Sequence, residues 1–511
     1  MGLRDQGSLW SIRLDVFVSG AVVMALEMVG SRLLAPFFGD SVFVWGSLIG
    51  VVMASLALGY YLGGRLADIE PSFRTFSLMI LTAGAVIVPI PMFSNTVLEA
   101  VLYSGLGERL GPVLASLILL AAPTTLLGMV SPYALRLAAS SLKNIGGVSG
   151  SLYSVSTGGS IFGTFFTVFV LIPSFGVRSI LFALGLVLMA TSLLGLAWNQ
   201  RLSTVLFMVA VLLLPSTPFL RGSLSIFTGT VVYRKDTAYS SLTVVDNRNR
   251  GIRTLYLNNL PHSAYYLNGS DVAVYTYTDY FNLGFVLNPE IESVLFIGGG
   301  GFSGPKQFLE HYPNITVDVV EIDPEVVNTA KKYFEVPDDP RLGVYVGDGR
   351  AFLVRAGRYD LIVLDAYSKS YVPFHLMTRE FFEVLADHLN PNGVVISNLI
   401  SSLIGDTSNL LMAEYKTIGE VFPQIYLFTT RDVSLSWVQN IILIATETET
   451  RFEKEDLQAM AEEAPLRSET LAVYSRNLVD WEIDTADSPL LTDDYAPTVA
   501  LLNPVTMSPY T

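Results

Sequence analysis

The sequence predicts a multi-pass α-helical membrane domain followed by a Rossmann-like α/β domain that begins with a small antiparallel β unit. Apolar stretches of nearly membrane-spanning length recur before residue 220 and not after it. Short alternating runs then occupy residues 229–260, and a glycine-rich turn follows a buried strand at residues 298–304. We therefore expect a transmembrane domain at 1–220, a β-hairpin domain at 228–275 and a Rossmann-like domain at 276–511.

The composition requires a membrane part. Hydrophobic residues make up 51% of the 511 residues, charged residues only 15%, and the mean hydropathy is +0.48. The formal net charge of -15 argues against a nucleic-acid partner, because phosphates attract a basic surface. The chain has no cysteine and four scattered histidines, so we expect no disulfide, no thiol catalysis and no metal site.

The apolar stretches each approach the roughly 20 residues that a spanning helix needs. They lie at residues 14–38, 43–64, 76–94, 112–138, 148–173, 178–198 and 202–217. We predict seven crossings of the plasma membrane, with an eighth as the alternative. Basic residues in the short loops place the N-terminus in the cytoplasm. Seven crossings would export the C-terminal domain, whereas an eighth crossing or a re-entrant segment within residues 95–111 would keep it inside. The side of the membrane on which this domain lies therefore stays open.

One spacing in the fifth apolar stretch indicates close helix packing. Gly159 and Gly163 lie four residues apart, which places both on one face of a helix. Small residues at this spacing let two membrane helices approach closely. We interpret the pair as a packing contact.

The soluble part begins with a predicted antiparallel β unit, whose runs 231–233, 241–245 and 254–257 alternate with turn residues. A helical stretch around residues 271–287 follows. Strands and helices then alternate, and the later runs 394–397, 425–428 and 441–444 suit a seven-stranded sheet that ends in a hairpin.

The candidate nucleotide site starts at the glycine turn after the strand 294–297. Glycines let the backbone turn sharply and bring free N–H groups close to a ligand at the start of the next helix, predicted near Pro305. Each of the next three strands ends in an acidic residue. These are Glu321 after 317–320, Asp348 after 344–346 and Asp365 after 361–364. All three belong at the carboxyl edge of a parallel sheet, where such sheets bind ligands.

Two kinds of nucleotide suit this turn. Gly299, Gly301 and Gly304 match the GxGxxG pattern of dinucleotide sites, which is a weak signal alone. The set of acids favours an S-adenosyl ligand instead, with Glu321 on the ribose, Asp348 on the adenine amine and Asp365 at the reacting end. The chain after the turn is also short for a two-half dinucleotide sheet.

Several motifs resemble the spermidine synthase (polyamine aminopropyltransferase) family over roughly residues 230–445. They are IGGGGFSG at 297–304, VEIDP at 320–324, GDGRAFL at 347–353, LDAYS at 364–368 and HLMTREFF at 375–382. Further segments are similar to a membrane-embedded, spermidine-synthase-like branch of that family. These are LEMVGSRLLAPFFG at 26–39, LGMVSPYALRL at 127–137, LYSVSTGGSIFGT at 152–164 and LLTDDYAP at 490–497.

The resemblance implies transfer of an aminopropyl group from decarboxylated S-adenosylmethionine to an amine such as putrescine, with release of methylthioadenosine. It implies that Asp365 is the base that takes the amine proton and that Tyr277 lies beside the amine. Implied adenosyl-binding residues are Gly298, Gly299, Gly300, Gly301, Glu321, Asp348 and Gly349. Implied substrate contacts are Tyr239, His262, Asp279, Ser368 and Trp437. The expected partners are a small amine and the lipid bilayer, with a homodimer as a further expectation.

The departures from the family pattern affect the amine end of the site. Gly301 stands where the family has the aspartate that holds the aminopropyl amine, and Ser368 stands where it has a second aspartate for the diamine. A buried ammonium without such carboxylates would be poorly compensated. Two alternatives therefore stay open. One is a lyase or another transferase that consumes intact S-adenosylmethionine in the same pocket, and the other is a transporter or sensor with a nucleotide-binding domain.

Overall fold

The computed structural model describes residues 3–38, 41–69, 71–139, 145–197, 228–270, 272–367 and 372–506. The chain divides into two compact units. The helical unit comprises Met1–Ile226 and Lys235–Ser240, and the α/β unit comprises Phe227–Arg234 and Ser241–Thr511. The predicted apolar stretch 202–217 and the predicted substrate contact Ser368 lie outside the described residues.

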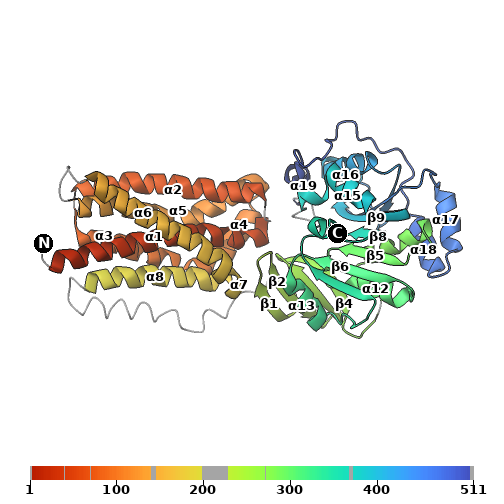
Figure 1. Cartoon of the computed structure of the whole chain (residues 1–511), viewed down its shortest axis with the longest axis horizontal. Coiled ribbons are helices and arrows are strands. Elements are labelled where there is room, and N and C mark those ends of the chain that lie inside the picture. Colours follow the sequence, from red (N-terminus) through yellow and green to blue (C-terminus); the bar gives the residue numbers. More distant parts are fainter. Residues whose placement is uncertain are drawn as a thin grey trace. The chain divides into compact units, whose positions relative to one another are not determined.

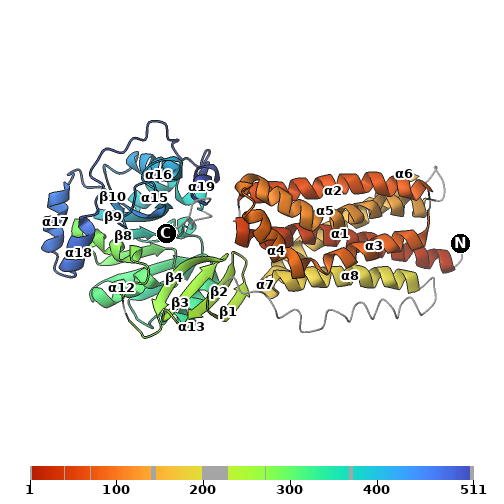
Figure 2. The same cartoon turned by 180° about the vertical axis from the view of Figure 1, so that it is seen from behind.

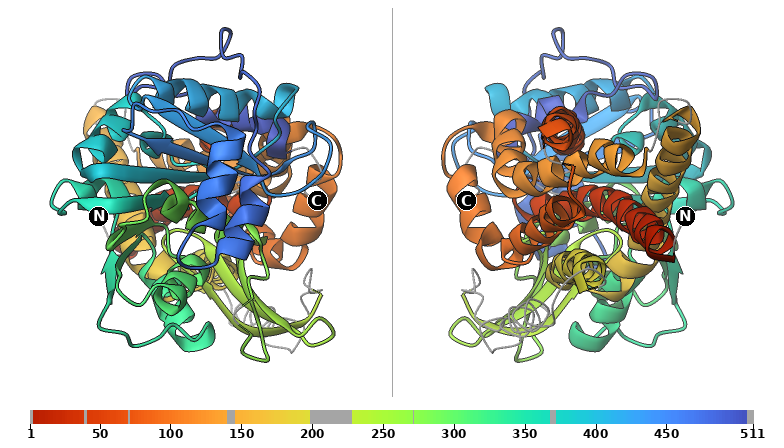
Figure 3. Two further views of the ribbon diagram at one scale, coloured as in Figure 1. Left: turned by 90° about the vertical axis from the view of Figure 1, so that its right-hand side faces the viewer. Right: turned by 90° about the vertical axis from the view of Figure 1, so that its left-hand side faces the viewer.

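Long helices run alongside one another in the helical unit, which Figure 3 views from its end. Its elements are α1 (Leu3–Phe38), α2 (Val42–Ile69), α3 (Phe73–Ile87), α4 (Ile90–Leu102), α5 (Gly107–Ala138), α6 (Ile145–Phe166), the π-helix η2 (Thr167–Leu171), α7 (Ile172–Ser174) and α8 (Val177–Ala197). Among the described residues, four segments are long and apolar enough to cross a membrane: Val42–Ile69, Arg109–Ala138, Ile145–Leu171 and Val177–Leu194. The helix α1 holds the first predicted stretch but is not one of these four. The count of seven crossings stays a prediction.

A bend separates α3 from α4. The two helices meet at 57° across Val88 and Pro89, and together they are apolar enough for a fifth span. Proline lacks the N–H that would continue the helical hydrogen bonds, which accounts for the break at this position. The pair fits either a broken span or a re-entrant loop. The re-entrant segment expected within residues 95–111 stays a prediction, because this bend lies before it.

Glycines bring α6 against α1. A Cβ atom at Gly159 would lie 2.1 Å from the carbonyl oxygen of Phe17, and one at Gly163 would lie 2.2 Å from that of Ala21. Only glycine permits this backbone approach, so the four-residue spacing serves helix packing, as interpreted from the sequence.

The α/β unit begins with a four-stranded antiparallel sheet, visible in Figure 2. Its strands are β1 (Thr230–Asp236), β2 (Ser241–Asn247), β3 (Ile252–Leu257) and β4 (Leu260–Tyr266), paired in that order. Asn258 and Asn259 both have positive φ and form the tight turn between β3 and β4. The strand β4 was not predicted from the sequence, because Pro261 lies at its start and is unusual in a strand.

A seven-stranded sheet follows, in the order β10-β11-β9-β8-β5-β6-β7. Its strands are β5 (Ser293–Ile297), β6 (Thr316–Glu321), β7 (Leu342–Val346), β8 (Tyr359–Leu364), β9 (Leu389–Ser401), β10 (Gln424–Thr429) and β11 (Gln439–Thr446). The strands β5 to β9 are parallel, whereas β11 pairs antiparallel with both β9 and β10. The predicted fold class is therefore confirmed, including the terminal hairpin.

Helices cover both faces of this sheet (Figure 1). They are α10 (Tyr277–Tyr280), η5 (Phe281–Leu283), α11 (Gly284–Leu287), α12 (Ser303–His311), α13 (Pro324–Tyr333), α14 (Gly349–Leu353), η6 (Phe374–Leu376), α15 (Arg379–Asp387), η7 (Asp406–Ser408), α16 (Asn409–Gly419), α17 (Lys454–Glu462), α18 (Ser468–Ser475) and α19 (Thr498–Thr506). On β5, Leu295 and Ile297 pack toward α15 and α16, whereas Val294 and Phe296 pack toward α12 and α17. Burial on both faces explains why these strands are continuous apolar runs in the sequence.

The strand order fixes the place of the site. The chain leaves β5 toward β6 on one side, and β8 lies on the other side, so β5 stands at the point where the order reverses. Loops at the carboxyl ends of the strands diverge at such a point and leave room for a ligand.

Candidate functional site

The glycine turn after β5 requires glycine at two positions for different reasons. Gly298 has a φ of +102°, and a Cβ there would lie 2.3 Å from the carbonyl oxygen of Asp365. At Gly301 a Cβ would lie 2.7 Å from the Cβ of Ser263, whose Oγ accepts the Gly301 N–H at 2.8 Å. The strand β4 thus lies against the turn and fills the space that a side chain at position 301 would need.

Glu321 at the end of β6 connects the turn to the second strand. Its Oε2 accepts the N–H groups of Gly299 at 2.9 Å and Gly300 at 3.2 Å, and its Oε1 accepts that of Asp323 at 3.0 Å. Burial raises the pKa of Glu321, while the three backbone hydrogen bonds act in the opposite direction. A carboxylate has about four acceptor positions, so Glu321 keeps capacity for a ligand hydroxyl.

Asp365 lies directly after β8 and is held by two side chains. Asn398 on β9 donates its Nδ2 to Oδ1 at 2.8 Å, and the Tyr277 hydroxyl donates to Oδ2 at 3.3 Å. Asn440 on β11 in turn donates to the Asn398 Oδ1 at 2.9 Å. Burial raises the pKa of Asp365 to about 7, with the charge of Glu321 adding to the effect. Such a carboxyl group can accept a proton near neutral pH.

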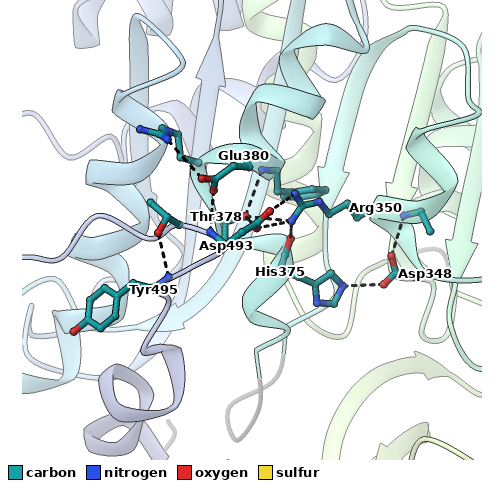
Figure 4. A network of polar contacts seen from close by, with 11 residues as sticks. Asp348, Arg350, His375, Thr378, Glu380, Asp493 and Tyr495 are labelled. Atoms are coloured by element: carbon teal, nitrogen blue, oxygen red, sulfur yellow. Dashed lines mark hydrogen bonds and ion pairs between the residues drawn. The ribbon is translucent and has the colours of Figure 1, made fainter.

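Asp348 occupies a shallower position after β7. Its Oδ1 caps α14 by accepting the Ala351 N–H at 2.9 Å, and its Oδ2 contacts the His375 Nε2 at 2.8 Å (Figure 4). Partial burial would raise the pKa of Asp348, but the hydrogen bonds outweigh it and the pKa is lowered. A Cβ at Gly349 would lie 2.4 Å from the Ile297 Cγ2, so glycine lets α14 approach the end of β5.

The structure thus brings the glycine turn, Glu321, Asp348 and Asp365 to one edge of the sheet and Tyr277 to Asp365. Asn398, Asn440 and the contact of His375 with Asp348 were not predicted from the sequence. The two asparagines were detectable as polar residues inside the apolar strands β9 and β11.

The predicted substrate contacts lie in different surroundings. His262 on β4 precedes Ser263, and burial lowers its pKa to about 4, which leaves it neutral. The Asp279 carboxylate contacts Arg467 at 3.4 Å and accepts the Tyr474 hydroxyl at 3.1 Å. Tyr239 belongs to the helical unit by its contacts. The side chains of Tyr239 and Trp437 are 47% and 51% exposed.

Part of this chain is similar to known proteins of polyamine chemistry. Residues 277–454 match the family described as "Spermine/spermidine synthase domain". A polyamine aminopropyltransferase of Vibrio vulnificus is 29% identical over 312 residues, which are 58% of this chain and 98% of that protein. Putrescine N-methyltransferase 1 of Nicotiana tabacum is 40% identical over 121 residues, which are 22% of this chain and 31% of that protein.

Solved structures are also similar to this chain. The crystal structure of a probable spermidine synthase from Corynebacterium glutamicum has a TM-score of 0.40 at 18% identity and covers 51% of this chain and 99% of its own. Among the described residues, no group of three or more His, Asp or Glu side chains could hold a metal ion. The domain match over residues 277–454 and the sequence similarity support the spermidine synthase family for the α/β unit.

Proposed function

We propose that this chain is a membrane-bound aminopropyltransferase-like enzyme, which uses decarboxylated S-adenosylmethionine with an amine acceptor and releases methylthioadenosine. The observation that carries the proposal is the buried carboxyl group of Asp365. It lies beside the glycine turn, contacts Tyr277 and has a pKa of about 7. A general base is most effective when its pKa is close to the working pH.

The residues around the turn suit an adenosyl group. The left-handed conformations of Gly298 and Gly300 bring the backbone close to the edge of the sheet, where a ligand can approach. Glu321 is positioned to accept ribose hydroxyls, and Asp348 is positioned to accept the adenine amine. The sulfonium of the bound substrate supplies the leaving group.

Asp365 then acts on the acceptor. It takes a proton from the ammonium form of the acceptor, whose pKa in water is about 10.4 and falls on burial. Tyr277 orients this carboxylate through its hydroxyl. The free nitrogen forms a C–N bond to the methylene beside sulfur, the C–S bond breaks, and its electron pair stays on sulfur. Alignment of the two substrates supplies much of the rate, because the sulfonium is already a good leaving group.

One observation favours a second candidate, in which the same pocket uses intact S-adenosylmethionine for transfer or cleavage. Position 301 is glycine, and Ser263 fills the space where a larger side chain would stand. An aspartate there would hold an aminopropyl ammonium but repel the carboxylate of the intact molecule. Its absence makes the site tolerant of that carboxylate.

Mass spectrometry of the products separates these functions. The full chain, purified in detergent, is incubated with S-adenosylmethionine or its decarboxylated form, with and without diamines. A longer polyamine formed only from the decarboxylated form supports the first proposal. Methylthioadenosine formed from the intact molecule without an acceptor supports cleavage. Turnover in none of the mixtures contradicts both and favours a transporter or sensor.

A further inference from the structure

A segment near the C-terminal end of the α/β unit is tied down beside the predicted adenine site. This segment, residues 491–495, is called the strap. The backbone of Leu491 accepts the Arg379 N–H at 2.8 Å and donates to the Thr417 Oγ1 at 3.0 Å. The Asp493 N–H donates to the Glu380 Oε2 at 3.0 Å. The strap is therefore fixed to α15 and α16 through its backbone and through the fully buried Leu491.

The Asp493 side chain reaches from the strap to α14 (Figure 4). Both of its oxygens accept from the Arg350 guanidinium at 2.7 Å, and its Oδ1 also accepts the Thr378 hydroxyl at 2.7 Å. A bidentate pair of this kind fixes direction as well as distance. Arg350 is therefore held in one orientation.

The same guanidinium connects to the predicted adenine acceptor. Arg350 donates to the backbone oxygen of His375 at 3.1 Å, and the His375 ring contacts the Asp348 Oδ2 at 2.8 Å. Arg350 also lies two residues after Asp348 at the start of α14. The strap thus acts on Asp348 from two sides, through the helix that Asp348 caps and through the histidine that its second oxygen contacts.

We propose that the strap sets the direction of the Asp348 carboxylate and thereby the selectivity of the site for an adenine base, with Asp493 as a positioning residue. This inference rests on the proposed function, in which Asp348 accepts the adenine amine. Asp348 is partly exposed, so its capping bond alone leaves the other oxygen free to turn. Outer hydrogen bonds that orient a binding group commonly govern affinity without touching the ligand.

The test compares two nucleosides that differ at the amine. Calorimetry measures binding of methylthioadenosine and methylthioinosine, in which an oxygen replaces the exocyclic amine, to the purified full chain. We expect the wild type to prefer the adenine compound. Asp493→Asn should reduce that preference about fivefold, which corresponds to the free energy that one partly exposed ion pair contributes. Binding of methylthioinosine should stay nearly unchanged, which a merely structural role of Asp493 would not produce.

Two further variants control the result. Asp494→Asn changes the neighbouring exposed carboxylate of the strap and should leave the preference intact. Arg350→Lys keeps the charge but loses the bidentate contact, so it should reproduce the loss, also where Asp493→Asn fails to fold. The double variant should lose no more of the preference for the adenine compound than either single variant, because both substitutions break the same contact.

The outcomes separate this inference from the function on which it rests. An unchanged preference in Asp493→Asn, or an equal loss for both nucleosides, overturns the role of the strap and leaves the proposed function standing. A wild-type chain that binds neither nucleoside overturns the proposed function, and the role of the strap with it.

Discussion

Asp365 and Asp348 follow two parallel strands of one sheet and yet have opposite electrostatic properties. Asp365 is buried and held by neutral donors, so its pKa is raised to about 7. Asp348 is partly exposed, caps α14 and contacts His375, so its pKa is lowered. The same residue type is thereby suited to moving a proton at one place and to staying ionised as an acceptor at the other. The surroundings of each aspartate, rather than the residue type, therefore determine its role at this edge of the sheet.

Removing the charge of Asp365 should have the largest effect. Asp365→Asn keeps the size of the side chain but cannot accept a proton, so turnover should fall at least about a hundredfold. Affinity for methylthioadenosine should change little. Unchanged rates in the product assay would remove Asp365 from the role of base.

Glu321→Gln should mainly weaken the structure of the turn. If the glutamine NH2 group takes the place of Oε2, it cannot accept the N–H groups of Gly299 and Gly300. The loss of such a hydrogen bond lowers the free energy of unfolding by about 2 kcal/mol. Thermal unfolding and nucleoside binding measure this loss. The exposed Glu420→Gln serves as the control, and equal unfolding temperatures for both variants would contradict the assignment.

The pH dependence of the rate should sharpen the comparison between the two acids. Asp365 must be ionised to act, so kcat/KM should rise with pH up to about 7 and then level off. Asp348 is ionised throughout this range and should add no further step.

Asn398→Ala should move this profile with a smaller effect on the rate. The Asn398 amide stabilises the charged form of Asp365, so its loss should shift the midpoint upward by about one pH unit. Turnover well above the midpoint should largely recover. A profile that does not move would show that another group controls the rate.

The parallel strands and the acids at their ends were predictable, because parallel strands are apolar runs and acids at their ends stand out. The contacts that tune these acids were not. Asn398 meets Asn440 only through the register of β9 and β11, in which Ile442 lies opposite Asn398. Asp279, expected at the amine, contacts Arg467, which is 188 residues away in the chain. Local motifs carry no information about such distant pairings.

The pair of asparagines behind Asp365 has a consequence for adaptation. Asn440 orients Asn398 from the adjacent strand, and Asn398 in turn donates to Asp365. Substitution at position 440 would therefore shift the pKa of Asp365, and with it the pH range of activity. The residues that contact the substrate would all stay the same. Relatives living at different internal pH would then be expected to differ on β11 rather than at the aspartate.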